Sequence, residues 1–247
     1  MENMKAIVLA AGKGTRMCSE NSDLPKVMRQ ALGRPLLHYV LSALSFIGAE
    51  NTVLVVGYKK EKVIEAFGGY TFAEQREQLG TGHAVMSARE ALEGYGGNVL
   101  VCCGDMPLLR GETYEALCRA HAQSDAACTV LSGTSSLPLP YGRVVRDEKG
   151  DFAYVVEDRD CTPEQKKIDE LNSGVYVFNA PKLFAALSEL KTDNAQGEYY
   201  LTDVPGILLK KGERVAVCKR EMGAELIGVN TPDQLAEVEG ILRERGL

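Results

Sequence analysis

Short and almost uninterrupted apolar runs, each followed by a glycine, recur along the first half of this chain. They comprise residues 5–11, 52–56 and 98–103, followed by Gly12, Gly57 and Gly104. A strand with one face in water would alternate apolar and polar residues, so these runs predict strands buried on both faces. Helical patterns are found at residues 35–48, 60–67, 81–93 and about 111–123. This alternation predicts an α/β fold with a mostly parallel sheet that helices cover on both faces.

The pattern changes after residue 126, where strands predominate. Strands are predicted at residues 126–132, 172–179, 214–218 and 226–230, with a hairpin at 143–157 that turns at 147–151. Helices are predicted at residues 181–190 and 199–211, and a last helix begins at Thr231 as N-cap, with Pro232 in its first turn. No internal repeat or flexible linker is visible. The β-rich part is therefore predicted to be an elaboration of one domain.

The charge of the chain excludes some classes of partner and suggests another. With 28 basic and 34 acidic residues, the net charge is −6, which argues against general binding to nucleic acids or anionic membranes. Residues 1–34 nevertheless hold six basic and three acidic residues. This local excess predicts a small anionic ligand, although chance clustering on a solvated surface would give the same count.

The cysteines and the hydropathy predict where the protein works. The seven cysteines include no C-x-x-C pair, and Cys102 and Cys103 lie inside an apolar run as small core residues. Such usage is typical of a reducing compartment. No apolar run approaches the ~18 residues that a membrane-spanning helix requires. We therefore expect a soluble, cytoplasmic protein.

A glycine loop, G-K-G-T-R at residues 12–16, directly follows the first predicted strand. Glycines allow backbone amides to approach phosphate oxygens, so the loop is a candidate phosphate cradle. The spacing does not match a P-loop, and a dinucleotide fingerprint would need a glycine where Met17 stands. Taken alone, the loop could equally be a tight turn with incidental charges.

The wider run L-A-A-G-K-G-T-R-M, followed by D-L-P-K-V, resembles the opening signature of the sugar-nucleotidyltransferases. Further motifs in the same order are Q-L-G-T-G-H-A at 78–84, G-D-M-P-L-L at 104–109, Y-G-R at 141–143, V-V-E at 155–157, N-S-G-V-Y at 172–176, N-A-Q-G-E-Y-Y-L-T-D at 194–203 and G-V-N at 228–230. The set covers essentially the whole chain. It is most similar to the uridyltransferase half of the bacterial bifunctional N-acetylglucosamine-1-phosphate uridyltransferases.

The resemblance implies a fold, a division of the chain and a reaction. The fold would be a Rossmann-like three-layer sandwich with a mixed, mostly parallel sheet and a β-rich sugar-binding insert. Residues 1–247 would form one domain, with a nucleotide-binding part at about 1–125, a sugar-binding part at about 126–230 and a C-terminal helix at 231–247. The reaction would join UTP and N-acetylglucosamine 1-phosphate, by in-line attack on the α-phosphate, into UDP-N-acetylglucosamine, a peptidoglycan precursor, and pyrophosphate.

The resemblance also implies the groups that assist this reaction. The attacking oxygen belongs to an ionised phosphate, so the step needs alignment and charge neutralisation rather than a side-chain base. Arg16, Lys26 and Asp105 match the catalytic positions, and Asp105 and Asn230 match the ligands of a Mg²⁺ ion. A carboxylate at the end of a strand suits Mg²⁺, although Asp105 could also cap a turn and Asn230 could be a plain turn residue.

The substrate-binding positions that the resemblance implies are Leu9, Ala10, Ala11, Gly12, Lys26, Gln75, Gly80, Thr81, Cys103, Gly104, Asp105, Gly142, Glu157, Asn172 and Asn230. Among these, Gln75 matches the position that reads uracil, because its amide offers one donor and one acceptor. Without the resemblance, Gln75 would be assigned to a solvated face. Gly142, Glu157 and Asn172 match positions that hold the sugar. Tyr199, Tyr200 and Thr202 are candidates for the wall of the pocket.

Two departures from the family pattern affect these expectations. The segment between Arg16 and the Pro25–Lys26 pair is about three residues longer than usual, which puts the reach of Lys26 in question. The chain also stops at Leu247 without the hexapeptide repeats of an acetyltransferase half, so we expect a monomer. Two alternatives remain: a related enzyme that joins glucose 1-phosphate to dTTP or UTP, and a non-catalytic sugar-nucleotide sensor.

Overall fold

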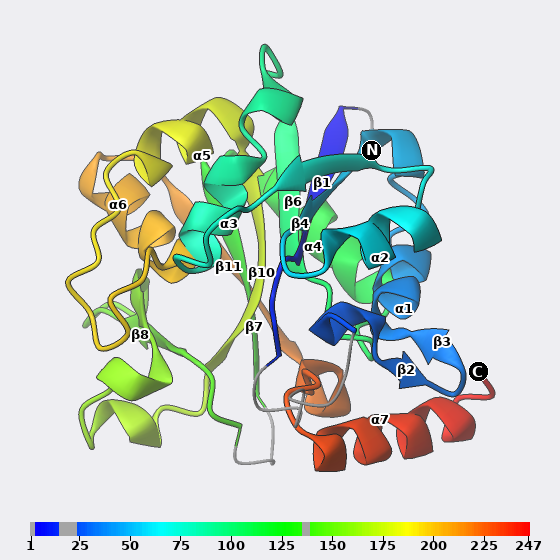
Figure 1. Ribbon diagram of the computed structural model, residues 1–247. Helices are drawn as coiled ribbons and strands as arrows, with labels where there is room; N and C mark the ends of the chain where they lie inside the picture. Colours follow the sequence, from blue (N-terminus) through cyan, green and yellow to red (C-terminus); the bar gives the residue numbers. More distant parts are fainter. Residues whose placement is uncertain (1–2, 15–23, 135–138) are drawn as a thin grey trace.

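The computed structural model describes residues 3–14, 24–134 and 139–247 (Figure 1). The expected catalytic residue Arg16 lies outside these ranges. The described residues form a central sheet with helices on both of its faces, which confirms the predicted fold class.

The central sheet has nine strands, seven of which lie side by side. Their order is β11 (Val215–Glu221), β7 (Cys128–Thr134), β10 (Leu171–Asn179), β6 (Asn98–Cys103), β1 (Met4–Ala10), β4 (Thr52–Val56) and β5 (Thr71–Glu74). The four strands from β6 to β5 run parallel, and β11 runs parallel to β7, whereas β10 is antiparallel to both of its neighbours. The hairpin of β8 (Arg143–Arg146) and β9 (Phe152–Val156) joins the sheet through β10.

Helices cover the two faces of the sheet as separate layers (Figure 1). One layer contains α3 (Thr81–Ser87), α5 (Ala180–Leu187) and α6 (Val204–Lys210), and the other contains α1 (Leu36–Ala43), α2 (Lys60–Ala66) and α4 (Gly111–Ser124). Successive side chains of a strand point to opposite faces. Accordingly, Ile7 and Val101 pack in the first layer, while Val8 and Leu100 pack in the second.

The last helix, α7 (Pro232–Glu244), packs on a smaller third cluster of buried residues. The predicted N-cap is confirmed, because the Thr231 side chain accepts a hydrogen bond from the Gln234 amide at 3.2 Å. This cap fixes where the chain turns into the helix, directly after Asn230. None of the helices in the described ranges is long and apolar enough to span a bilayer.

Some predicted elements are wrong in their type or their bounds. Residues 226–230 are not a strand: a 3-10 helix at Gly223–Leu226 leads into a loop. The apolar side chains of this run are buried in that loop, which hydropathy alone does not distinguish from a strand. The helix predicted from residue 199 begins only at Val204, after a 3-10 turn. The helix at 35–48 is shorter, spanning Leu36–Ala43, and that at 81–93 ends at Ser87 before a separate 3-10 turn at Glu90–Leu92.

Three short strands were not predicted. These are β5 at the edge of the sheet and the two-residue strands β2 (Gln30–Ala31) and β3 (Arg34–Pro35), which pair with each other. Strand β5 has the sequence T-F-A-E and only one buried residue, so it lacks the apolar run that marked its neighbours. It nevertheless determines where Gln75 lies, directly after its last residue.

Candidate active site

A cavity of about 360 Å³ opens where strands β1 and β6 end. Ligands of open α/β sheets bind at the carboxyl ends of the strands, because the strand order leaves a crevice there. The expected site residues that line it are Leu9, Thr81, Cys103, Asp105, Gly142, Glu157, Asn172 and Asn230. They come from segments far apart in the sequence, so the fold brings together residues expected for the nucleotide, the metal and the sugar.

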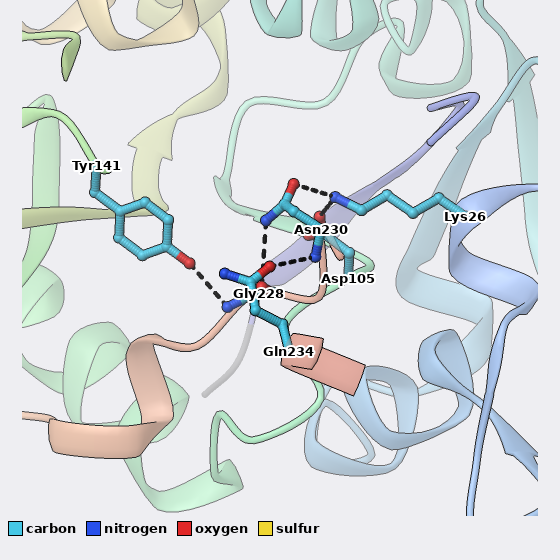
Figure 2. A network of polar contacts seen from close by, with 6 residues as sticks. All are labelled: Lys26, Asp105, Tyr141, Gly228, Asn230 and Gln234. Carbon is cyan, nitrogen blue, oxygen red and sulfur yellow. Dashed lines mark hydrogen bonds and ion pairs between the residues drawn. The ribbon is translucent and has the colours of Figure 1, made fainter. Parts of the chain in front are cut away.

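Next to the cavity, the Lys26 ammonium lies between two oxygen ligands, Asp105 and Asn230 (Figure 2). These two residues line the cavity, whereas Lys26 does not. The ammonium group of Lys26 donates to a carboxylate oxygen of Asp105 and, at 2.8 Å, to Oδ1 of Asn230. The side chains of Lys26 and Asp105 are only 14% and 19% exposed. Lys26 therefore reaches both residues despite the longer segment that precedes it.

Backbone contacts place Asp105 and Asn230 next to each other. The Gly104 amide donates to the Leu9 carbonyl at 2.9 Å, which ties the end of β6 to the end of β1. The Val229 amide donates to the Asp105 carbonyl at 2.9 Å, which ties the loop before α7 to the same point. The strand ends and the start of α7 thus converge on one site.

The amide of Asn230 has a defined orientation (Figure 2). Its Nδ2 donates to the Gly228 carbonyl at 3.2 Å, so its Oδ1 is directed to Lys26. Gly228 is held in turn, because its amide donates to the Tyr141 hydroxyl at 2.8 Å. The backbone amide of Asn230 donates to Oε1 of Gln234 on α7 at 2.8 Å. This network presents an amide oxygen to the same point as the Asp105 carboxylate.

The donor set at this point fits Mg²⁺. Mg²⁺ prefers oxygen ligands and is commonly held by one or two protein groups, with substrate phosphates and water completing its shell. Asp105 and Asn230 supply a carboxylate and an amide oxygen, and both already contact a cation in the form of the Lys26 ammonium. Within the ranges described, no group of three or more His, Cys, Asp or Glu side chains could hold a metal.

The glycine loop after β1 packs on Lys26. Ala10 and Ala11 are buried, and a Cβ atom on Gly14, whose φ is +70°, would lie 2.8 Å from the Lys26 Cβ. A Cβ atom on Gly12 would meet nothing within 4 Å, so the backbone there is open. The described part of the loop therefore lies beside the cation site. The Thr15 and Arg16 positions are outside the described residues.

Gln75 lies at the neighbouring strand end with its amide engaged by the protein. Its Nε2 donates to the Gly80 carbonyl at 3.1 Å and lies 3.2 Å from Nδ1 of His83. We expected Gln75 to offer a ligand one donor and one acceptor. The structure supports only the acceptor, because both contacts of Nε2 are with protein acceptors and Oε1 alone is left for a ligand. Gly80 has a φ of +106°, and a Cβ there would lie 2.7 Å from the Tyr199 carbonyl oxygen.

The lining of the cavity also includes the residues expected for the sugar. Asn172 is 5% exposed, and its Nδ2 donates to the Tyr176 hydroxyl at 2.7 Å. Its Oδ1 is buried without a hydrogen-bond partner in the described structure. Since a buried acceptor is normally paired, this atom marks a place for a ligand donor. The backbone amide of Asn172 also donates to the Gly142 carbonyl at 2.8 Å, so two of the residues expected for the sugar are joined by a hydrogen bond.

Glu157 is a carboxyl group in an acidic and poorly solvated environment. Burial raises its pKa, and Asp203, Asp160 and Asp158 add to the effect, while a hydrogen bond from Thr202 at 2.9 Å opposes it. This bond gives Thr202 a defined position in the wall, which the sequence left without a role. Burial also raises the pKa of Cys103 to about 12, so its thiol stays protonated near neutral pH and is not a nucleophile.

Several lining or supporting residues carried no assigned role in the sequence analysis. They are Tyr141, Asp158, Arg159, Tyr176, Gln196 and, beside Gln75, His83. Four of them, Tyr141, Tyr176, Gln196 and His83, stand inside the family motifs, so the motifs themselves were the available signal. Their roles depend on contacts with distant residues, such as Tyr141 with Gly228.

The mixed sheet, with a glycine loop, a carboxylate, an amide and a lysine at its strand ends, agrees with the resemblance to the nucleotidyltransferases. The MobA-like NTP transferase domain matches residues 6–201. Because this match spans most of the chain, the protein belongs to that family. The family-level resemblance seen in the motifs is thereby confirmed.

Individual relatives agree with this family, and one solved structure shares the fold. The chain is 46% identical over 248 residues to a bifunctional protein GlmU from Pelobacter propionicus, and 44% identical over 246 residues to one from Pelotomaculum thermopropionicum. Each alignment covers 99% of this chain and 53% of the relative, so the chain spans about half the length of these proteins. The structure of a UDP-glucose pyrophosphorylase with UDP-glucose has a TM-score of 0.76 at 18% identity, covering 98% of this chain and 99% of that one.

Proposed function

We propose that this chain transfers the uridylyl group of UTP to N-acetylglucosamine 1-phosphate. A phosphate oxygen of the sugar phosphate forms a bond to the α-phosphorus of UTP, the bond to the bridging oxygen breaks, and pyrophosphate leaves with the electron pair. The observation that carries the proposal is one cavity lined by Asp105 and Asn230, which Lys26 contacts, and by Asn172, whose acceptor oxygen is unpaired. The family match and the relatives support it.

The cluster of Lys26, Asp105 and Asn230 serves the phosphates in this proposal. The two substrates are polyanions, so their approach and the charge of the leaving pyrophosphate must be offset by cations and amides. Lys26 supplies a positive charge from one side, and Arg16 matches a second cationic position. A Mg²⁺ ion held by Asp105 and Asn230 would add charge neutralisation at the same point.

The sugar side supplies recognition rather than chemistry. The Oδ1 of Asn172 accepts a hydrogen bond from an N–H or O–H group of the sugar phosphate, and Glu157 accepts from hydroxyl groups. An amide acceptor and a carboxylate in one pocket suit an N-acetylhexosamine, which offers both an amide N–H and hydroxyls. The protein would act in the cytoplasm as a monomer. All six cysteines within the described ranges are free thiols, which is compatible with a reducing compartment.

The proposal is tested by omission. Purified protein is incubated with UTP, N-acetylglucosamine 1-phosphate and MgCl₂, and pyrophosphate release is followed while each component is left out in turn. We expect release only with all three, together with a UDP-N-acetylhexosamine product by mass spectrometry. Pyrophosphate release that needs no sugar phosphate, or none under any condition, would overturn the proposal. The second outcome would instead favour a sensor that binds the nucleotide sugar without turnover.

A further inference from the structure

The side-chain amide of Gln75 is held at two points by the first turn of α3. One is the Gly80 carbonyl, 3.1 Å from Nε2. This carbonyl also accepts the Ala84 amide at 3.1 Å, in the opening turn of the helix, so it is fixed by the helix itself. A carbonyl oxygen can only accept, so the group that faces it must be the NH₂ end of the amide. The Gly80 contact therefore sets which end of Gln75 points inwards.

The second point is the imidazole of His83. Its Nδ1 lies 3.2 Å from the same Nε2, and since Nε2 can only donate, Nδ1 must be the acceptor. The ring hydrogen of His83 is then on its own Nε2. The ring is held in place beside Tyr199, with centroids 6.4 Å apart and an interplanar angle of 30°. The Gly82 amide donates to the Tyr199 carbonyl at 2.7 Å, so the helix and this tyrosine are fixed to each other.

With both of its hydrogens used, Gln75 has one polar atom left to offer. Its side chain is largely enclosed, with 4% of the residue exposed. Its Oε1 accepts no hydrogen bond from any described residue. This oxygen is not fully enclosed by the protein, so a donor from outside can reach it. Gln75 follows β5, whose end lies beside that of β4, at the edge where the cavity opens. The residue therefore presents an acceptor and no donor to this edge.

We propose that His83 is a positioning residue that makes Gln75 selective for a nucleobase with a ring N–H. Uracil and thymine carry a hydrogen on N3 that can be donated to Oε1, whereas cytosine has a lone pair at N3 that would face the oxygen. His83 touches neither the base nor the phosphates, and acts by keeping the Nε2 hydrogens occupied. This inference rests on the proposed function for the location of the base at Gln75.

Two variants of His83 separate a hydrogen-bonding role from a packing role. H83N keeps an acceptor at the δ position but removes the ring that lies beside Tyr199. H83F keeps a ring but has no acceptor. The readout is the ratio of kcat/KM for UTP to that for CTP, with KM and kcat resolved for each. H38N, which changes a histidine outside the site, is the matched control, and melting temperatures establish that all the variants fold.

We expect H83N to keep the UTP to CTP ratio within about twofold of the unsubstituted protein, and H83F to lower it about fivefold, through the KM for UTP, as loss of one hydrogen bond does. If H83F keeps the ratio and H83N lowers it, His83 acts by packing and the inference is wrong. An unchanged ratio in both variants also overturns it. Binding of UDP and CDP, measured by calorimetry without a sugar phosphate, gives the same comparison. It decides the role of His83 even if uridylyl transfer to N-acetylglucosamine 1-phosphate is not observed.

Discussion

At the scale of single residues, the centre of the site is a position between two oxygen ligands that is occupied by the ammonium group of a lysine. The ammonium group of Lys26 contacts both Asp105 and Asn230, the residues expected to hold the metal. An ammonium and a Mg²⁺ ion cannot occupy one point, so Lys26 would have to leave this position in the proposed metal-bound form. In that form, Lys26 and a Mg²⁺ ion would supply two positive charges, which would stabilise the charge that develops during transfer of a polyanion.

Replacing Asp105 by asparagine tests the metal assignment. The variant keeps the size of the side chain but removes the negative charge that attracts both Lys26 and Mg²⁺. We expect turnover at saturating MgCl₂ to fall at least about 100-fold, comparable to the loss of a key electrostatic group in other enzymes. Turnover is measured across a MgCl₂ titration, with the exposed Glu148→Gln as control. Full Mg²⁺-dependent turnover in Asp105→Asn would show that Asp105 is not a ligand.

The unpaired oxygen of Asn172 predicts a specific kinetic change. In Asn172→Leu the acceptor is lost while the volume is kept, so one hydrogen bond to the sugar phosphate disappears. We expect the KM for N-acetylglucosamine 1-phosphate to rise about fivefold, for a net loss of about 1 kcal/mol, with the KM for UTP within about twofold. Initial rates with each substrate varied in turn give both constants. Equal rises in the two KM values would contradict a role confined to the sugar.

At the scale of the elements, the residue directly before α3 is a glycine, Gly80, whose conformation and surroundings exclude a side chain. Gly80 has a φ of +106°, and a Cβ atom would lie 2.7 Å from the Tyr199 carbonyl oxygen and 2.8 Å from the Glu198 Cβ. The same turn holds the amide of Gln75. The start of this helix is therefore fixed by close contact with the Glu198–Tyr199 segment, so we expect a change there to affect both stability and the position of Gln75.

We expect Gly80→Ala to lower the free energy of unfolding by about 2 kcal/mol or more, from backbone strain together with the close contacts. The matched control is Gly96→Ala, because Gly96 has no positive φ and a Cβ there meets nothing within 4 Å. The control should stay within about 0.5 kcal/mol of the unsubstituted protein. Both values come from urea unfolding followed by circular dichroism. Equal stability of the two variants would show that the Gly80 turn adapts.

Glu170 links β7, β8 and β10 at the base of the β-rich part. It is 4% exposed, accepts a hydrogen bond from Ser132 at 2.6 Å and two from Arg146 at 2.8 Å. Burial alone would raise its pKa, but the hydrogen bonds from Arg146 and Ser132 outweigh that effect and hold the pKa below its usual value. The ionised carboxylate therefore stabilises the folded protein at neutral pH.

Glu170→Gln should cost about 1–3 kcal/mol of unfolding free energy at pH 7, because a charged partner is removed from a buried set of hydrogen bonds. Since the folded-state pKa is lowered, this contribution is complete above the unfolded pKa of about 4.3 and is lost as the pH falls through the folded-state value. The stability difference between the two proteins should therefore shrink between pH 7 and pH 3. A difference that grows as the pH falls would contradict the direction of the pKa shift.

The elements show what the sequence could and could not predict. Strands β1, β4 and β6 were predictable because each is an almost uninterrupted apolar run and is largely buried. The loop at residues 227–230 was not, because Ile227 and Val229 are buried without strand pairing, and hydropathy reports burial rather than pairing. Strand β5 was missed because an edge strand of four residues needs few apolar side chains.

At the scale of the whole molecule, the site depends on contacts that no spacing in the sequence specifies. Asp105 and Asn230 meet because the loop before α7 bonds back to the end of β6, through the Val229 amide and the Asp105 carbonyl. Family motifs identified both residues, whereas local patterns left each of them as a possible turn residue. The role of His83 illustrates the limit: it matches no metal or triad pattern, and its contact with Gln75 becomes visible only in the folded chain.

The net charge of the molecule is negative, but its charges are distributed in a way that agrees with a small anionic substrate. The net charge is −6, yet Lys26 contacts two residues that line the cavity, and the first 34 residues carry an excess of basic groups. The acidic groups near Glu157 lie on the sugar side. In the proposed complex, negative charge would face the hydroxyl groups of the sugar, and positive charge would face the phosphates.

The measurement that tests the central claim most directly is a competition among substrates. The protein is given UTP, dTTP and CTP at equal concentration, together with equal N-acetylglucosamine 1-phosphate and glucose 1-phosphate, and the nucleotide sugars formed are identified by mass. The account predicts that UDP-N-acetylglucosamine dominates the products. Predominant UDP-glucose or dTDP-glucose, or the absence of any nucleotide sugar, would contradict it.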